Sequence, residues 1–134
     1  MEARKVIESA DEFYRLRTSD DIVEYQRAAD EEAPLAVWEE IIARYPEMKF
    51  WVAQNKTVPI VILETLAADA DVRVRSMVAS KRKLPEQLQL QLARDPSESV
   101  RESLAYNAQA TQRTLQLLAN DLVPRIREKV RSRV

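Results

Sequence analysis

Apolar and polar positions follow a pattern that recurs every 26 residues over the last 77 residues of the chain. Four positions carry the pattern: Leu66, Leu92 and Leu118; Ala67, Ala93 and Ala119; Asp69, Asp95 and Asp121; and Arg75, Arg101 and Arg127. A period of this length is typical of stacked supersecondary units rather than of one closed globule. The repeats span residues 58–83, 84–109 and 110–134, the last being one residue short.

Each repeat predicts two short helices joined by a tight turn. Leu88 and Leu92 lie four residues apart in the first half of one repeat, and Val100 and Leu104 in the second half, so each pair shares a helical face. The segments between them, ADAD, RDPS and NDLVP, are rich in residues that end one helix and cap the next. Such a hairpin cannot bury its own apolar face, so neighbouring repeats must stack.

Residues before 58 depart from this pattern. Residues 33–57 read as a degenerate repeat, in which Ala43 stands where the other repeats have the turn aspartate. Residues 1–32 do not repeat and predict two capping helices, over about 10–17 and 20–30. We expect their apolar and aromatic residues to close the end of the stack: Phe13, Tyr14, Leu16, Ile22 and Tyr25. The predicted fold is an all-α, right-handed α-solenoid forming one structural domain.

Composition excludes several classes of function. The chain has no histidine, cysteine or glycine, so it lacks the usual general base, thiolate nucleophile, zinc ligands and phosphate-cradling loop. We therefore expect no enzyme, no cofactor and no metal site. The N-terminal segment MEARKVIESADEF has no apolar core of a signal peptide, and the longest apolar run, VPIVIL, is too short to span a bilayer. A cytoplasmic protein without a membrane partner is expected.

Charge is divided unevenly along the chain. Residues 1–71 carry 8 basic and 16 acidic side chains, whereas residues 72–134 carry 13 basic and 6 acidic ones. Such a dipolar molecule can steer a charged partner to one end, and it permits head-to-tail self-association into a homo-oligomer.

The repeats resemble those of the HEAT-like superfamily, in particular the bacterial leucine-rich repeat variant class. The segments that carry the resemblance are LAADADVRVRSMVAS, LARDPSESVRESLAYN and LANDLVPRIREKV. Each contains Leu-Ala-x-Asp, a short turn, and then Val or Ile followed by Arg. The resemblance covers residues 34–134 and implies a binding scaffold, since arrays of this kind hold diverse partners. Some relatives bind nucleic acid.

Two interpretations of the recurring charges stay open. The basic column Lys49, Arg75, Arg101 and Arg127 could form a positive spine for phosphate groups. Alternatively, it could form a structural ladder with Asp69, Asp95 and Asp121, which lie six residues before the arginines. Partly buried charges are normally paired, which favours the ladder, within or between repeats.

A second set of basic residues lies in the connections between repeats. Lys81, Arg82 and Lys83 follow one another, and Lys56 lies one period earlier. A short basic run is usually a solvated loop. The alternative is an anion-binding edge, whose affinity would fall steeply with salt.

Aromatic residues cluster at Trp38, Tyr45, Phe50 and Trp51. Trp38 and Trp51 are expected in the core, whereas Phe50 falls on the opposite side of its helix from Met48. An exposed phenylalanine is a plausible anchor for a partner. In HEAT-like stacks the second helices line the concave side, so the resemblance implies a binding groove lined by these residues: Phe50, Gln54, Ser76, Ser80, Glu102 and Tyr106.

The leading hypothesis from the sequence is a non-catalytic module that holds a protein or peptide on the concave face of its repeats. An adaptor or an immunity-type partner of an effector fits this description. The alternative hypothesis is a nucleic-acid-binding protein that uses the basic C-terminal half.

Overall fold

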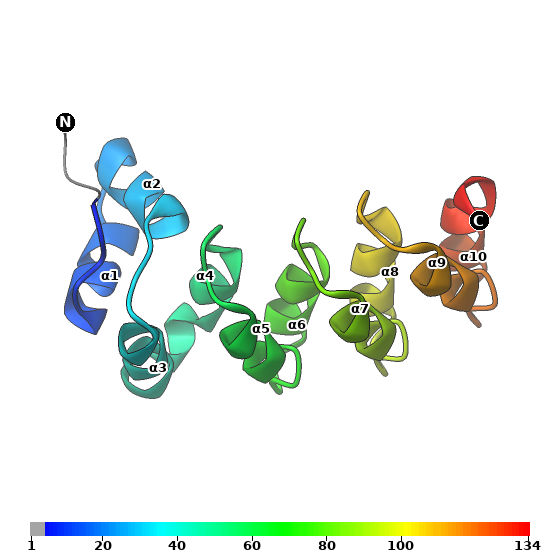
Figure 1. Cartoon of the computed structure of the whole chain (residues 1–134), viewed down its shortest axis with the longest axis horizontal. Coiled ribbons are helices and arrows are strands. Elements are labelled where there is room, and N and C mark those ends of the chain that lie inside the picture. The colour runs from blue at the N-terminus through cyan, green and yellow to red at the C-terminus, as the bar shows by residue number, and fades with distance from the viewer. Residues whose placement is uncertain (1–4) are drawn as a thin grey trace. The chain divides into compact units, whose positions relative to one another are not determined.

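The computed structural model describes residues 5–134, which fold into helices joined by short turns (Figure 1). Within that range no β-strand is present, and the only sheet-like contact is an isolated backbone bridge between Val6 and Glu32. The all-α prediction is confirmed. The helices are α1 (Ala10–Arg17), α2 (Ile22–Asp30), α3 (Leu35–Arg44), η1 (Pro46–Met48), α4 (Lys49–Gln54), α5 (Ile60–Leu66), α6 (Val72–Ala79), α7 (Glu86–Leu92), α8 (Glu98–Tyr106), α9 (Gln112–Leu118), α10 (Pro124–Val130) and η2 (Arg131–Arg133). None of these helices is both long and apolar enough to cross a bilayer.

The chain divides into two compact units, Met1–Leu63 and Glu64–Val134, which we call the N-terminal unit and the C-terminal unit. Their boundary lies inside α5, and the expected division into capping helices up to residue 32 and repeats from residue 33 stays a prediction. The expectation of one structural domain stays a prediction.

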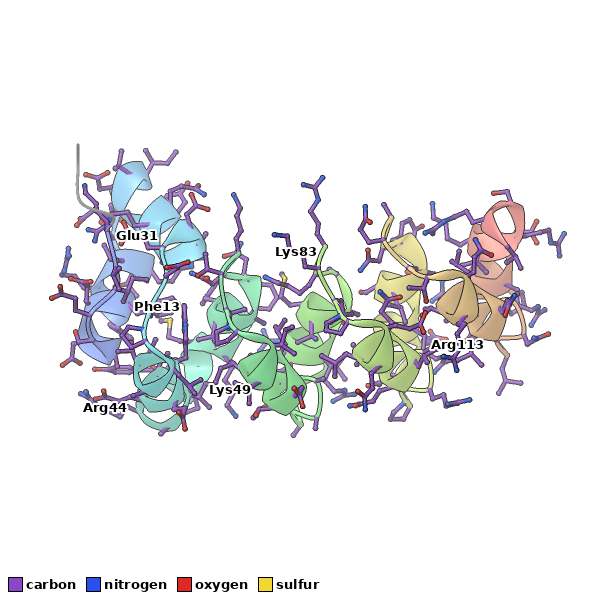
Figure 2. All side chains as sticks on the ribbon, viewed as in Figure 1. Phe13, Glu31, Arg44, Lys49, Lys83 and Arg113 are labelled. Atoms are coloured by element: carbon purple, nitrogen blue, oxygen red, sulfur yellow. The ribbon has the colours of Figure 1, made fainter. Side chains whose placement is uncertain are left out.

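In the N-terminal unit, α1 packs against α2 and α3, and α4 packs against the same two helices. Phe13 of α1, labelled in Figure 2, and Trp38 of α3 are both fully buried, and their rings meet edge to face with centroids 5.7 Å apart. Helix α1 begins where expected because the Ser9 hydroxyl accepts the Glu12 N–H at 3.0 Å. This aromatic pair therefore forms the centre of the N-terminal core.

The second capping helix differs from its expected form. It begins at Ile22 rather than near residue 20, because the Asp21 carboxylate caps it by accepting the Val23 N–H at 2.8 Å. Ile22 is 65% exposed instead of closing the core. The physical reason is that α2 buries only one residue, Ala28, so its first turn stays at the surface. Tyr14 and Tyr25 are also exposed.

In the C-terminal unit, the helices form two rows. Helix α8 packs against both α6 and α10, while α7 packs against α9 (Figure 1). Side chains buried within the unit recur at the period of the sequence: Val74, Val100 and Ile126; Val78, Leu104 and Val130; and Leu92 and Leu118. The periodic apolar positions are thus the ones that pack one repeat of this unit on the next.

The absence of glycine imposes no strain on the turns. No residue between 5 and 134 has a positive φ, so no turn in that range needs the conformation that glycine supplies at low cost. The free backbone N–H groups at several helix starts are bound by side chains. Asp71, Ser97 and Thr111 cap α6, α8 and α9 by accepting the N–H groups of Arg73, Ser99 and Thr114.

We expect Leu104→Ala to lower the free energy of unfolding by about 2–5 kcal/mol, because it leaves a cavity in the fully buried centre of α8. Urea denaturation followed by circular dichroism measures this change. Leu122→Ala is the matched control: Leu122 is 91% exposed, so its truncation should change the free energy by less than about 0.5 kcal/mol. Equal effects of the two substitutions would contradict the assigned packing.

Candidate functional site

The recurring arginines and aspartates of the C-terminal unit form ion pairs between successive repeats. Arg75 donates from Nε to Oδ2 of Asp95 at 2.8 Å and from Nη2 to Oδ1 at 3.1 Å. Arg101 makes the same two-pronged contact with Asp121, at 2.8 and 3.4 Å. The side chains are 13% and 6% exposed in the first pair, and 15% and 5% in the second. Nearly buried, bidentate pairs of this kind are strong and geometrically specific.

The same arginines also hold the turn of their own repeat. The Nη1 groups of Arg75, Arg101 and Arg127 donate to the carbonyl oxygens of Asp69, Asp95 and Asp121, at 2.8, 2.8 and 2.6 Å. The Asp95 carboxylate in turn accepts the Ser97 N–H at 2.9 Å. The hydrogen bonds that Arg75 donates to the Asp95 carboxylate raise the pKa of the Arg75 guanidinium. Arg75 and Arg101 are therefore engaged inside the unit and are not a free spine for phosphate groups.

A second set of hydrogen bonds joins the ends of the second helices. Asn107 donates from Nδ2 to the carbonyls of Ala79 and Lys81, both at 2.9 Å. Arg133 donates to the carbonyls of Ala105 and Asn107, at 2.6 and 2.7 Å. These bonds satisfy carbonyls that a helix end leaves without intrahelical partners.

The N-terminal unit has an equivalent contact, in which Asn55 donates to the carbonyls of Ala28 and Glu31 at 2.8 and 3.0 Å. Residue type alone does not identify these positions as structural. The signal in the sequence is their spacing, because Asn55, Lys81, Asn107 and Arg133 lie 26 residues apart and all carry side-chain N–H donors.

The residues expected to bind a partner are distributed over both units. Phe50 and Gln54 lie on α4 in the N-terminal unit. Phe50 is half-buried rather than exposed, because its ring meets that of Trp51 edge to face with centroids 4.8 Å apart. Trp51 is only half-buried, and the Arg17 guanidinium covers its ring at 3.4 Å.

In the C-terminal unit, Ser76 lies on α6, Ser80 ends that helix, and Glu102 and Tyr106 lie on α8. Glu102 forms an ion pair with Arg125, which also contacts Glu98 at 3.4 Å. The Ser80 hydroxyl donates to the Ser76 carbonyl at 3.0 Å. Glu102 is thus part of a charge network on α8 and α10, while Tyr106 keeps its ring at the surface.

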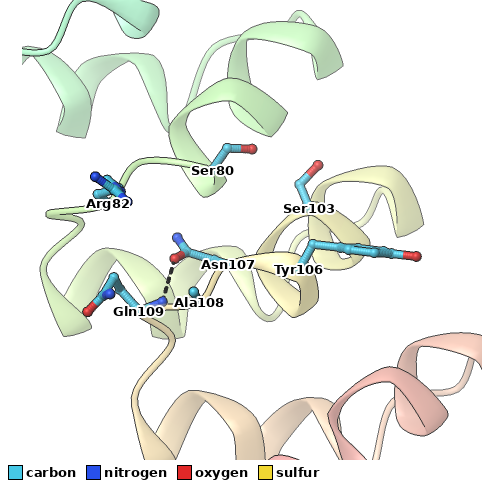
Figure 3. A pocket seen from close by; sticks show the side chains of 7 residues that line it. All are labelled: Ser80, Arg82, Ser103, Tyr106, Asn107, Ala108 and Gln109. Carbon is cyan, nitrogen blue, oxygen red and sulfur yellow. Dashed lines mark hydrogen bonds between the residues drawn. The ribbon is translucent and has the colours of Figure 1, made fainter.

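A pocket of about 350 Å³ lies beside Tyr106 (Figure 3). It is lined by Ser80, Arg82, Ser103, Tyr106, Asn107, Ala108 and Gln109. Tyr106 is 64% exposed, and the Lys129 ammonium lies 4.2 Å from the centroid of its ring. Asn107 Oδ1 accepts the Gln109 N–H at 2.8 Å, which orders the far wall. The pocket brings together Ser80, Arg82 and Tyr106, three of the residues singled out in the sequence.

The expected basic edge consists of residues in different environments. In the N-terminal unit, Lys56 pairs with Asp30 at 3.0 Å and lines a pocket of about 180 Å³ together with Gln54 and Trp51. In the C-terminal unit, Arg82 and Lys83 are exposed on the loop between α6 and α7 (Figure 2). Lys81 is half-buried, and this burial lowers its pKa to about 8. Lys81 is therefore a poorer anion ligand than the two residues that follow it.

No group of three or more acidic side chains in the part of the chain that the structure describes could hold a metal ion. The chain matches no protein-family model, no curated protein and no solved structure. What the surface can do must therefore be inferred from its own residues.

We expect the Lys81 ammonium to lose its proton with a midpoint near pH 8, because burial disfavours its charged form. A pKa lower in the folded than in the unfolded chain means that stability rises with pH between about 8 and 10.5. NMR titration of the lysine Cε resonances measures the midpoint, and Lys81→Gln identifies the signal. A Lys81 signal that stays unchanged up to pH 10 would contradict the burial of this ammonium group.

Proposed function

We propose that this chain is a non-catalytic binding module that holds a protein or peptide partner. The observation that carries the proposal is Tyr106, an aromatic side chain 64% exposed at the edge of a pocket with hydrogen-bonding walls. Roles as an adaptor or as an immunity-type partner, and a cytoplasmic location, stay predictions of this proposal.

The proposal includes the finer architecture, a right-handed α-solenoid of the HEAT-like type with three regular repeats and one degenerate repeat. Its support comes from the 26-residue period and from the C-terminal unit. There, ion pairs and hydrogen bonds link successive repeats, such as the pair of Arg75 with Asp95 and the bond of Asn107 to the Lys81 carbonyl. Arrays held together in this way offer extended surfaces to a partner.

The composition of the pocket suits a polypeptide. Tyrosine contributes a large contact area with few rotatable bonds, and exposed tyrosines are frequent anchors of protein interfaces. The Lys129 ammonium over the ring restricts it further. Around it, the serine hydroxyls of Ser80 and Ser103 and the amide of Gln109 can donate to or accept from a peptide backbone.

A nucleic-acid ligand is less well supported by the charges. Most basic side chains of residues 72–134 contact groups inside the C-terminal unit: Arg73, Arg75, Arg101, Arg113, Arg125 and Arg131 pair with carboxylates, and Arg127 and Arg133 donate to carbonyls. Of the described residues in this segment, Arg82, Lys83 and Arg94 have side chains without a hydrogen bond, an ion pair or a ring contact, whereas Lys129 lies over the Tyr106 ring. Three free cations are few beside the roughly 6–10 phosphate contacts of a typical DNA-binding protein.

Selection of peptides from a random display library on the full chain tests the proposal. We expect selected peptides to bind the wild type with micromolar affinity. Their affinity for Tyr106→Ala should be at least about tenfold lower, because truncation removes an interface anchor worth more than about 1.4 kcal/mol. Leu122→Ala, which truncates another exposed side chain of the same unit, should leave the affinity unchanged.

Peptides that bind Tyr106→Ala as tightly as the wild type would contradict the assigned site.

Fluorescence anisotropy with a short DNA duplex tests the other ligand class. Tight binding that falls with salt with a log–log slope of several units, and that is lost when Arg82 and Lys83 are replaced by glutamate, would contradict the proposed function itself.

A further inference from the structure

Arg127, the third arginine of the series, has side-chain N–H donors that bind no acceptor among residues 5–134. Arg75 and Arg101 each donate from Nη1 to a turn carbonyl, and from Nε and Nη2 to a carboxylate of the next repeat. Arg127 makes the first contact, from Nη1 to the Asp121 carbonyl at 2.6 Å. Its Nε and Nη2 groups have no hydrogen-bond or ion-pair partner among residues 5–134. Arg127 thus presents two parallel donors without an acceptor.

We propose that Arg127 is a binding site for the carboxylate of an aspartate carried by an acidic peptide segment of a partner protein. Arg127 lies on α10 and is not among the residues that line the Tyr106 pocket, so the proposal does not depend on that pocket. The chemistry of the ligand follows from the two pairs already present in this unit, in which an aspartate fills the equivalent position.

These two pairs also indicate the conformation of the ligand. Asp95 and Asp121 each use Oδ1 to accept the N–H two residues further on, from Ser97 and Val123, both at 2.9 Å. A helix starts directly after each of these turns. We therefore expect a ligand in which the aspartate opens a tight turn, because that turn directs the carboxylate toward the guanidinium.

The Arg127 side chain is held ready for this contact. Its Nη1 bond to the Asp121 carbonyl fixes one edge of the planar guanidinium, and the side chain is half-buried. A fork that is already oriented loses little conformational freedom on binding a carboxylate. Bidentate contacts of this kind are stronger than those of a lysine, which presents a point charge.

Charge around Arg127 favours an acidic partner. The segment 125–133 contains five basic residues and one acidic residue, in the order RIREKVRSR. Arg125 and Arg131 are paired with glutamates, but the segment keeps a positive net charge. A positive patch attracts acidic segments and disfavours basic ones.

A second copy of this chain is a poor occupant. Asp95 and Asp121 are already paired in the C-terminal unit, and Asp69 also has interactions within the chain. The degenerate repeat has Ala43 where the other repeats have this aspartate. Because the turn aspartates of the repeats are engaged inside the chain, we take an acidic segment of another protein as the occupant.

Titration of the full chain with a peptide tests the proposal. The probe is acetyl-ARDPSE-amide, which reproduces the aspartate turn at residues 93–98. We expect a saturable shift of the Arg127 Nε–Hε signal in ¹⁵N NMR spectra, with a Kd on the order of 1 mM for this single contact. A peptide with asparagine in place of the aspartate should bind at least about fivefold more weakly, because it lacks the charge.

Arg127→Lys keeps the positive charge but loses the two parallel guanidinium donors, so it should weaken binding at least about threefold. That titration follows the peptide signals, since the arginine signal is lost. Arg94→Lys is the matched control: Arg94 is exposed and its side chain has no hydrogen bond or ion pair within the described chain, so the affinity should not change. Tyr106→Ala should also leave this titration unchanged, which separates the result from the proposed function.

Three results would overturn the proposal. The Arg127 signal could fail to shift up to about 20 mM peptide, far above the expected Kd. The asparagine peptide could bind as well as the aspartate peptide. Arg94→Lys could weaken binding as much as Arg127→Lys, which would show that only the general positive charge attracts the peptide.

Discussion

The C-terminal unit depends on the bidentate ion pair between an arginine of one repeat and an aspartate of the next. Charged groups can be removed from water only when their charge and hydrogen bonds are compensated. Arg75 and Arg101 meet this condition by binding both a carboxylate and a turn carbonyl. The aspartate completes the arrangement by ordering its own turn through the N–H two residues on. One residue pair thus sets the turn inside a repeat and the position of that repeat on its neighbour.

This constraint determines which side chains remain available to a ligand. Most arginines of the C-terminal half are engaged in internal contacts, so the excess of positive charge in the sequence overstates the basic surface. Two side chains remain available to a ligand, each for a different reason. Tyr106 is exposed because its helical position faces away from the core, and Arg127 keeps two donors because no aspartate of the described residues lies against them. The first suits a polypeptide surface, and the second a carboxylate.

The helices could be predicted from the sequence because capping residues and apolar spacing are local signals. Ser9 and Thr111 are residue types that cap helices and do so here, and the periodic valines and leucines are buried. What depends on contacts distant in sequence could not be predicted. A helical wheel places Phe50 away from the core, but it cannot show that the neighbouring Trp51 ring covers it. Likewise, the apolar character of Ile22 gives no sign that Ala28 is the one buried residue of α2.

A double-mutant cycle on Arg75 and Asp95 tests the central claim most directly. The free energy of unfolding is measured for the wild type, Arg75→Gln, Asp95→Asn and the double variant, where asparagine retains the oxygen that accepts the Ser97 N–H. If the ion pair holds the repeats together, the two substitutions are coupled by about 1–3 kcal/mol, since a contacting pair departs from additivity. Effects that add to within about 0.5 kcal/mol would contradict the account, because the buried pair would then contribute nothing beyond its separate residues.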